Sequence, residues 1–282
     1  MMQDGQSFSD PSGEKINSSL HPFEKLFDQI YVINLSTRLD RWEKMKKRLE
    51  SLGISHYVRI EAVDGRTQPY LNSWKALTTQ VFQGRHKLYT PGSYGYLLSM
   101  LRIFNDAKNH HHQQILVLDD DVLFHRFAQK SDYQRICDGI QEKPGWKLIY
   151  FGCCHKHHHD RHQTGRAKNY GKATLLTADQ YLSHYGKGSI NGSFFNGYHH
   201  SIFDKMINMI STSRVPFDTG PLRYQYTGYP KGVLLTSVQF GVQEMNDSDI
   251  QQQTMTDNNS RLIKDWDGKW IIISKPQLNV FL

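Results

Sequence analysis

The chain has 282 residues, of which 38% are hydrophobic and 22% are charged, as is ordinary for a soluble globular protein. Its formal net charge of +7 suits nucleic acid, an anionic membrane or a nucleotide-diphosphate substrate equally, because its basic residues are mostly scattered. Three cysteines exclude a disulfide framework, and no apolar run is long enough to span a membrane. Because residues 1–22 are polar without a signal-peptide pattern, we expect a flexible lead-in, one domain over 23–282, and a cytoplasmic location.

The first part of the chain alternates predicted strands and helices. Residues 30–35 form an apolar run typical of a buried strand, and residues 37–52 have the spacing of a helix with Thr37 as its N-cap. A second strand is predicted over 56–62 and ends at the turn Asp64-Gly65. A strand, a helix and a strand with short connections indicate the start of a nucleotide-binding α/β fold.

The rest of the chain continues this alternation less regularly. Residues 68–91 are predicted to be irregular, and the apolar tail from Arg261 is expected to pack on the domain. The other predicted elements are helices over 94–108, 127–141 and 202–210 and strands over 115–118, 148–151, 193–198 and 233–240. This order predicts an α/β fold in which helices flank a Rossmann-like mixed sheet.

Three carboxylates, Asp119, Asp120 and Asp121, directly follow the predicted strand over 115–118. In open α/β sheets, ligands bind outside the carboxyl ends of the strands. Mg²⁺ and Mn²⁺ prefer carboxylate oxygens, often with substrate phosphates as further ligands. The segment therefore indicates a metal–diphosphate site, although an acidic turn after a strand is the alternative. Because side chains alternate along a strand, we take Asp119 and Asp121 as the metal ligands and expect Asp120 to point the other way.

The motifs at residues 34–41, 92–99 and 117–121 stand in an order that resembles glycosyltransferase family 25. This family includes lipooligosaccharide-biosynthesis galactosyltransferases and their procollagen galactosyltransferase relatives. It typically has a strand ending in Asn-Leu, an Arg-x-Asp-Arg helix start, a Val-Asp-Gly turn, a Gly-x-x-Gly-x-x-x-Ser-His helix and a Glu-Asp-Asp strand end. The turn is present here as Val63-Asp64-Gly65.

Weaker matches extend the resemblance along most of the chain, from about residue 29 to residue 250. They are the predicted strand before Gly152, a Pro-x-Asp element at Asp218 and a Ser-Asp-Ile element at Asp249. Two positions depart from the family pattern, since Met100 stands where the family has His and Asp119 where it has Glu. These departures leave open a degenerate relative that acts as a non-catalytic basic binding module.

The resemblance implies a GT-A-like domain that uses Mn²⁺ or Mg²⁺ to transfer a hexose, galactose or glucose, from a UDP-sugar. The acceptor is expected to be a hydroxyl group on a glycan, a lipid-linked glycan or a protein. The family's inverting chemistry needs a base beside that hydroxyl, for which Asp218 is the first candidate and Asp249 the second.

The remaining motif residues are expected to bind the donor. Arg38 and Arg41 offer forked, permanently charged donors to the diphosphate or the base, although surface helix residues are the alternative. Asp64 is expected to accept a hydrogen bond from uridine, unless it only forms the turn. The predicted donor-binding set is completed by Asn34, Ser99 and Asp120.

A His-rich segment over residues 155–162, preceded by two cysteines, suggests a zinc-dependent hydrolase as a further alternative. Adjacent histidines point in different directions, however, and no second ligand pair stands at zinc-site spacing, so a polar loop is favoured. We expect no nucleic-acid partner, because zinc-finger spacing, Arg-rich segments and interleaved aromatic residues are all missing from the sequence.

Overall fold

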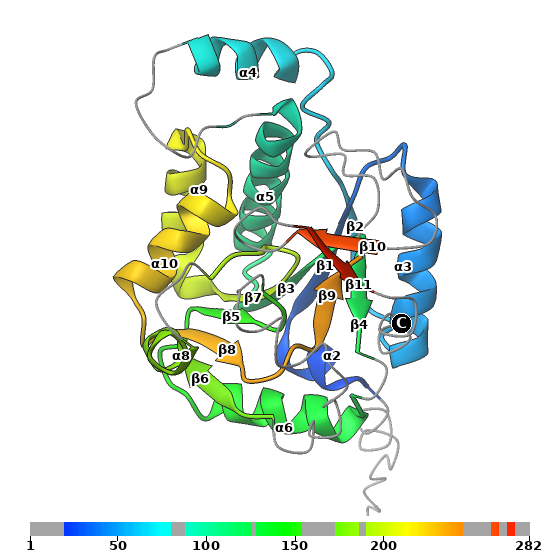
Figure 1. Ribbon diagram of the computed structural model, residues 1–282, viewed down its shortest axis with the longest axis vertical. Helices are drawn as coiled ribbons and strands as arrows, with labels where there is room; N and C mark the ends of the chain where they lie inside the picture. The colour runs from blue at the N-terminus through cyan, green and yellow to red at the C-terminus, as the bar shows by residue number, and fades with distance from the viewer. Residues whose placement is uncertain are drawn as a thin grey trace, which may run out of the picture.

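The central element of the fold is a seven-stranded mixed sheet with the strand order β2-β1-β3-β7-β5-β8-β6 (Figure 1). The computed structural model describes residues 20–79, 88, 90–125, 128–153, 173–185 and 190–244, and the backbone of 261–264 and 270–273. The strands of the sheet are β1 (Gln29–Asn34), β2 (Val58–Glu61), β3 (Gln114–Asp119), β5 (Leu148–Tyr150), β6 (Leu175–Thr177), β7 (Phe195–His199) and β8 (Val233–Thr236). The predicted mixed α/β architecture is confirmed.

Strand directions place several carboxyl ends on one edge of the sheet. Strand β1 is parallel to both β2 and β3, and β5 is parallel to β8. Strand β7 is antiparallel to both β3 and β5, so β3 and β5 run in the same direction. The carboxyl ends of β2, β1, β3, β5 and β8 therefore lie along the same edge, where α/β sheets bind ligands.

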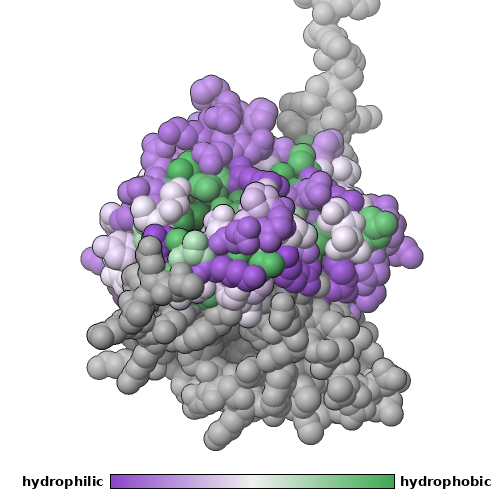
Figure 2. All heavy atoms as spheres, turned by 90° about the horizontal axis from the view of Figure 1, so that it is seen from above, coloured by the Kyte–Doolittle hydropathy of each residue, from purple (hydrophilic) through white to green (hydrophobic). Residues whose placement is uncertain are grey.

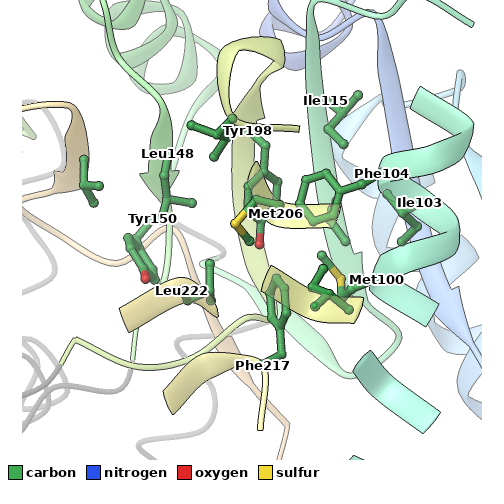
Figure 3. Packing of buried hydrophobic residues seen from close by; sticks show 14 of the residues in the cluster. Met100, Ile103, Phe104, Ile115, Leu148, Tyr150, Tyr198, Met206, Phe217 and Leu222 are labelled. Carbon is green, nitrogen blue, oxygen red and sulfur yellow. The ribbon is translucent and has the colours of Figure 1, made fainter. Parts of the chain in front are cut away.

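Helices cover both faces of the sheet. The α-helices are α2 (Pro22–Leu26), α3 (Leu39–Leu52), α4 (Tyr70–Thr79), α5 (Pro91–Asn109), α6 (Lys130–Gln141), α8 (Ala178–Tyr185), α9 (Phe203–Thr212) and α10 (Arg223–Gly228). Consecutive residues of β1 pack into two different hydrophobic cores. Tyr31 packs with residues of α5 and α9, whereas Val32 packs with residues of α2, α3 and α6. Figure 3 draws part of the first of these two clusters. The sheet is thus the middle of three layers.

Several predicted boundaries were wrong. Helix α3 begins at Leu39, and its N-cap is Arg38, whose carbonyl accepts the first helical hydrogen bond, so Thr37 is not the cap. The segment 68–91, predicted to be irregular, contains α4. The strand predicted over 233–240 ends at Thr236. The strand β6 and helix α8 were not predicted, because their short segments carry little periodicity.

A second, two-stranded sheet lies next to the carboxyl end of β3. It pairs β4 (Val122–Phe124) with β9 (Gly241–Gln243) in antiparallel register. Another two-stranded pair is formed by β10 (Arg261–Lys264) and β11 (Trp270–Ile273). Because β4 starts at Val122, only Asp120 and Asp121 separate it from β3, and this two-residue turn sets the geometry of the acidic segment.

In the view from above, the coloured part of the surface is mostly hydrophilic, with apolar side chains in smaller patches (Figure 2). Within the part of the chain that the structure describes, none of the helices is both long enough and apolar enough to cross a membrane.

Candidate functional site

The three aspartates lie at the carboxyl edge of the main sheet, at the end of β3. Asp119 is the last residue of β3, and Asp120 and Asp121 form the turn into β4. The apolar residues of β3 before them are fully buried, which holds the carboxylates at a defined place. Asp120 and Asp121 are only 7% exposed, so their charges need either partners or protons.

Asp120 has both of its carboxylate oxygens engaged by protein donors. Asn34 Nδ2 donates to Asp120 Oδ2 over 2.5 Å, and Arg41 Nη1 donates to Asp120 Oδ1 over 3.3 Å. Burial raises the pKa of Asp120, while these two donors act in the opposite direction. The structure therefore brings together three predicted donor-binding residues in one buried cluster.

Asp119 and Asp121 are bound differently, because neutral donors hold one oxygen of each. Tyr96 Oη donates to Asp119 Oδ1 over 3.0 Å, and Gln243 Nε2 donates to Asp121 Oδ2 over 3.1 Å. Arg41 Nη1 lies 3.9 Å from Asp121 Oδ2. Among the described residues, Asp121 Oδ1 is buried without a hydrogen-bond partner. The other oxygen of Asp119 likewise makes no hydrogen bond to the described part of the chain.

The electrostatics of this pair favour a positive ligand. Burial, and then the charge of Asp121, raise the pKa of Asp119 well above its usual range. Burial, and then the charge of Asp120, raise the pKa of Asp121 to about 7. Within the described ranges, no group of three or more His, Cys, Asp or Glu side chains is arranged to hold a metal ion. Two carboxylates with one oxygen each still to be bound fit a divalent cation whose other ligands come from a substrate.

Asn34 connects the acidic segment to the start of α3 and to β2. Its Nδ2 also donates to the carbonyl of Arg38 over 3.1 Å, and its Oδ1 accepts from Arg59 Nη2 over 2.5 Å. The Arg38 side chain is 22% exposed and pairs with Asp40 at 3.0 Å. Of the two predicted diphosphate ligands, Arg38 thus lies nearer to solvent than the buried Arg41.

Ser99 joins helix α5 to the Val-Asp-Gly turn. It is fully buried, and its hydroxyl accepts from Val63 N over 2.8 Å and donates to the Gly95 carbonyl over 2.9 Å. A Cβ on Gly95 would lie 2.2 Å from the carbonyl oxygen of Val63, so only glycine permits this backbone contact. The Gly and Ser of this motif hold the turn against α5.

Asp64, in the same turn, is bound by its neighbour Arg66. Arg66 Nε and Nη2 donate to the two carboxylate oxygens over 2.7 and 2.8 Å, and Arg66 N donates to Oδ1 over 2.9 Å. The hydrogen bond from the Arg66 side chain lowers the pKa of Asp64. Asp64 is therefore a charged acceptor at neutral pH.

Asp218, the first candidate for the base, begins the π-helical segment η3 (Asp218–Leu222). Its Oδ1 accepts from Thr219 N over 2.8 Å. The ring of the preceding Phe217 lies 5.9 Å from the ring of Tyr96, so this segment packs against the residue that binds Asp119. Asp249, the second candidate, lies outside the described residues.

Met100, at the position where the sequence pattern described above has His, is a core residue. It is 0% exposed and packs in the cluster that contains Ile103 and Phe217 (Figure 3). Its thioether therefore fills apolar space on α5. The His-rich segment over 155–162 lies outside the described residues.

Two contacts of the site were missed from the sequence. Tyr96 stands between Gly95 and Ser99 in the motif over residues 92–99, and this position was the available signal. Gln243 carries no such signal, because it reaches Asp121 only through the pairing of β9 with β4.

Comparison with protein families and curated proteins gives consistent matches. A family model described as "Glycosyltransferase family 25 (LPS biosynthesis protein)" matches residues 27–208. Procollagen galactosyltransferase 2 of Homo sapiens is 33% identical over 141 residues, which are 47% of this chain and 22% of that protein. A glycosyltransferase 25 family member of Anopheles gambiae is 33% identical over 136 residues, 46% of this chain and 23% of that protein.

Not all similar proteins bear the name of an active enzyme. The probable inactive glycosyltransferase 25 family member 3 of Bos taurus is 33% identical over 139 residues, 46% of this chain and 22% of that protein. The chain thus spans less than a quarter of the length of these three relatives.

Among solved structures, the chain is similar to a glycosyltransferase involved in the glycosylation of the major capsid of PBCV-1. The match covers 73% of this chain and 80% of that chain, at 11% sequence identity and a TM-score of 0.38. A score at this level supports no conclusion about activity.

Proposed function

Since the chain belongs to glycosyltransferase family 25, we propose that it transfers a hexose, galactose or glucose, from a UDP-sugar to an acceptor hydroxyl. The proposed reaction inverts the anomeric carbon and uses Mn²⁺ or Mg²⁺. The observation that carries this proposal is the pair Asp119 and Asp121 at the edge of the sheet, each with one oxygen that no described residue binds. The proposed acceptor is a glycan, a lipid-linked glycan such as a lipooligosaccharide, or a protein, and the proposed compartment is the cytoplasm.

Asp119 and Asp121 are the proposed metal ligands. Their carboxylate oxygens are the ligand type that Mn²⁺ and Mg²⁺ prefer. Their pKa values are raised first by burial and then by the charge of a neighbouring aspartate. A divalent cation bound there would act as a Lewis acid on the charge that develops on the departing UDP. Asp120 is not in this pair, because Asn34 and Arg41 already occupy both of its oxygens.

The proposed donor site extends from the aspartates along the strand ends of β1 and β2. Asn34, Arg41 and Asp120 form its buried base and orient the acidic segment. Arg38, which is partly exposed at the start of α3, is the proposed contact to the diphosphate. Asp64 is the proposed acceptor for a uridine N–H or hydroxyl, since Arg66 keeps it charged.

The proposed general base is Asp218, with Asp249 as the second candidate. Asp218 is partly exposed, and its segment packs through Phe217 against Tyr96, which binds Asp119. A base at this place would take the proton of the acceptor hydroxyl as it attacks the anomeric carbon. We expect Asp218→Asn to lower kcat at least 100-fold while the dissociation constant of UDP stays within about 3-fold.

The test is release of UDP from a panel of UDP-sugars, measured with Mn²⁺ and with a chelator. Wild type should release UDP in a metal-dependent way, and Asp121→Asn should lose about 100-fold or more of this activity. Asp204→Asn is the matched control, because Asp204 is exposed on α9 and pairs with Lys108 away from the aspartates. No turnover, together with no metal-dependent binding of UDP, would contradict the proposal.

Two alternatives have distinct outcomes in the same assay. A non-catalytic binding module is favoured by the buried Met100 and by the relative named probable inactive, and it would show no turnover with any donor. A zinc-dependent hydrolase using the His-rich segment would lose activity on zinc chelation and would be indifferent to Asp121→Asn.

A further inference from the structure

The two proposed metal ligands share a pattern of support that Asp120 lacks. An uncharged donor from a different element holds one oxygen of each carboxylate: Tyr96 of α5 binds Asp119, and Gln243 of β9 binds Asp121. Asp120 instead accepts a hydrogen bond from the cation Arg41 at 3.3 Å, whereas Arg41 lies 3.9 Å from Asp121. A hydrogen bond from a hydroxyl or an amide orients a carboxylate while leaving it its charge, whereas a salt bridge balances that charge.

Tyr96 is itself held firmly in place. Gly95 and Ser99, on either side of it in α5, fix the helix to the Val63 turn. The Tyr96 ring packs against Phe217, and its hydroxyl lies 3.0 Å from Asp119 Oδ1 and 3.3 Å from the carbonyl oxygen of Ser193. A tyrosine whose helix and ring are fixed in this way restricts the rotamer of the carboxylate that its hydroxyl binds.

We infer that Tyr96 is a positioning residue of the cation site, and that its hydroxyl orients Asp119 so that the second carboxylate oxygen is available to the metal. Gln243 does the same for Asp121. This inference rests on the proposed function, because it assumes that Asp119 and Asp121 bind a divalent cation. On this inference, Tyr96 and Gln243 raise the affinity of the site for that cation.

The hydroxyl of Tyr96 can be tested apart from its ring. Tyr96→Phe keeps the ring that packs on Phe217 and removes only the donor to Asp119. Tyr94→Phe is the matched control, since Tyr94 lies two residues earlier on α5 and partly packs on the same core. Gln243→Leu is the parallel change on β9, at an exposed position that tolerates an apolar side chain.

The first readout is the dissociation constant of Mn²⁺ for the full chain without donor, measured by calorimetry or by the electron paramagnetic resonance signal of free Mn²⁺. We expect Tyr96→Phe to weaken Mn²⁺ binding about 10- to 100-fold, as is typical when a group that orients a metal ligand is removed. Gln243→Leu should weaken it by about 10-fold, and Tyr94→Phe should stay within about 2-fold of wild type.

The second readout separates positioning from catalysis. In the UDP-release assay, Tyr96→Phe should raise the Mn²⁺ concentration for half-maximal rate, while kcat at saturating Mn²⁺ returns to within about 5-fold of wild type. Wild-type Mn²⁺ affinity in Tyr96→Phe would overturn the inference and leave the proposed function standing. Failure of the wild-type chain to bind Mn²⁺ or Mg²⁺ would overturn the metal-dependent function and the inference together.

Discussion

Asn34 and Asp120, which are 86 residues apart in the chain, are joined by a hydrogen bond of 2.5 Å between Nδ2 and Oδ2. The bond links the carboxyl ends of the neighbouring strands β1 and β3. Arg41, at the start of α3, completes the cluster through Asp120 Oδ1. Because Asp120 and Arg41 are both buried, their pairing supports the structure of the edge on which the candidate site lies.

Removing the charge of Asp120 should destabilise the protein. Asp120→Asn leaves the buried Arg41 with a weaker partner, so we expect the free energy of unfolding to fall by about 3 kcal/mol in urea titrations. Asp40→Asn, which breaks the exposed pair with Arg38, should change it by less than about 1 kcal/mol. Equal effects of the two substitutions would contradict a structural role for Asp120.

When no metal is bound, removing the charge of Asp121 should not destabilise the protein, in contrast to the change at Asp120. Burial, and then the charges of Asp120 and Glu244, disfavour the ionised form of Asp121, and Asp121→Asn removes this cost. We expect the metal-free variant to be as stable as wild type or up to about 2 kcal/mol more stable, while Mn²⁺ no longer raises its melting temperature. A large loss of stability without metal would show that Asp121 holds the fold and would argue against its role as a ligand.

The contact between α5 and the Val63 turn predicts a strict requirement for glycine at residue 95. In Gly95→Ala, the new methyl group would lie 2.2 Å from the Val63 carbonyl oxygen, which is backbone and cannot rotate away. We expect a loss of about 1–3 kcal/mol in the free energy of unfolding and weaker binding of UDP. Gly228→Ala is the control, since its nearest atom is 3.9 Å away, and it should be neutral or slightly stabilising.

His21 predicts a loss of stability at mildly acidic pH. Burial lowers its pKa from 6.5 to about 4, and its Nδ1 accepts a hydrogen bond from Phe23 N, so the folded protein favours neutral imidazole. The neutral His21 therefore contributes fully to the free energy of unfolding above pH 6.5. As the pH falls towards 4, up to about 3 kcal/mol of this contribution is lost. The carboxyl groups of Asp119 and Asp121, whose pKa values are raised, titrate in this range with the opposite sign, so the slope is measured as the difference between wild type and a His21 variant in urea titrations at each pH.

His21→Asn is the control for that slope, since asparagine keeps an N-cap acceptor and does not titrate. Between pH 6.5 and 4, the variant should lose the His21 part of the pH dependence, so wild type should lose up to about 3 kcal/mol of stability relative to it. Glu24 acts in a separate, lower range: although burial opposes it, the N–H groups of His56 and Ser55 hold its pKa at about 2. A variant that keeps the wild-type slope above pH 4.5 would show that another group causes it.

Much of the fold could be predicted from local sequence pattern. The buried strands β1 and β3 and the helices α3 and α5 carry enough apolar residues at strand or helix spacing to be recognised without a neighbour. Strands β4 and β9 are three residues long, and they exist because they pair with each other. Such elements have no pattern of their own, so the sequence did not reveal them.

The candidate site divides in the same way. The acidic segment, the Asn-Leu strand end and the Gly-Ser helix are contiguous motifs, and the sequence located each of them. Tyr96, which binds Asp119, is 23 positions away from it in the sequence. Gln243, which binds Asp121, is 122 positions away from it. Local pattern carries no information about such pairs.

By itself, the sequence determined that three carboxylates stand at the end of a buried strand, because hydrophobic periodicity and strand ends are local properties. Only the tertiary structure decided which of these carboxylates is already neutralised. Strand pairing brings Asn34 to Asp120 and Gln243 to Asp121, while helix packing brings Arg41 to Asp120 and Tyr96 to Asp119. The difference between a structural carboxylate and a candidate metal ligand depends on those distant donors, since hydrogen bonds and charges act through space and not along the chain.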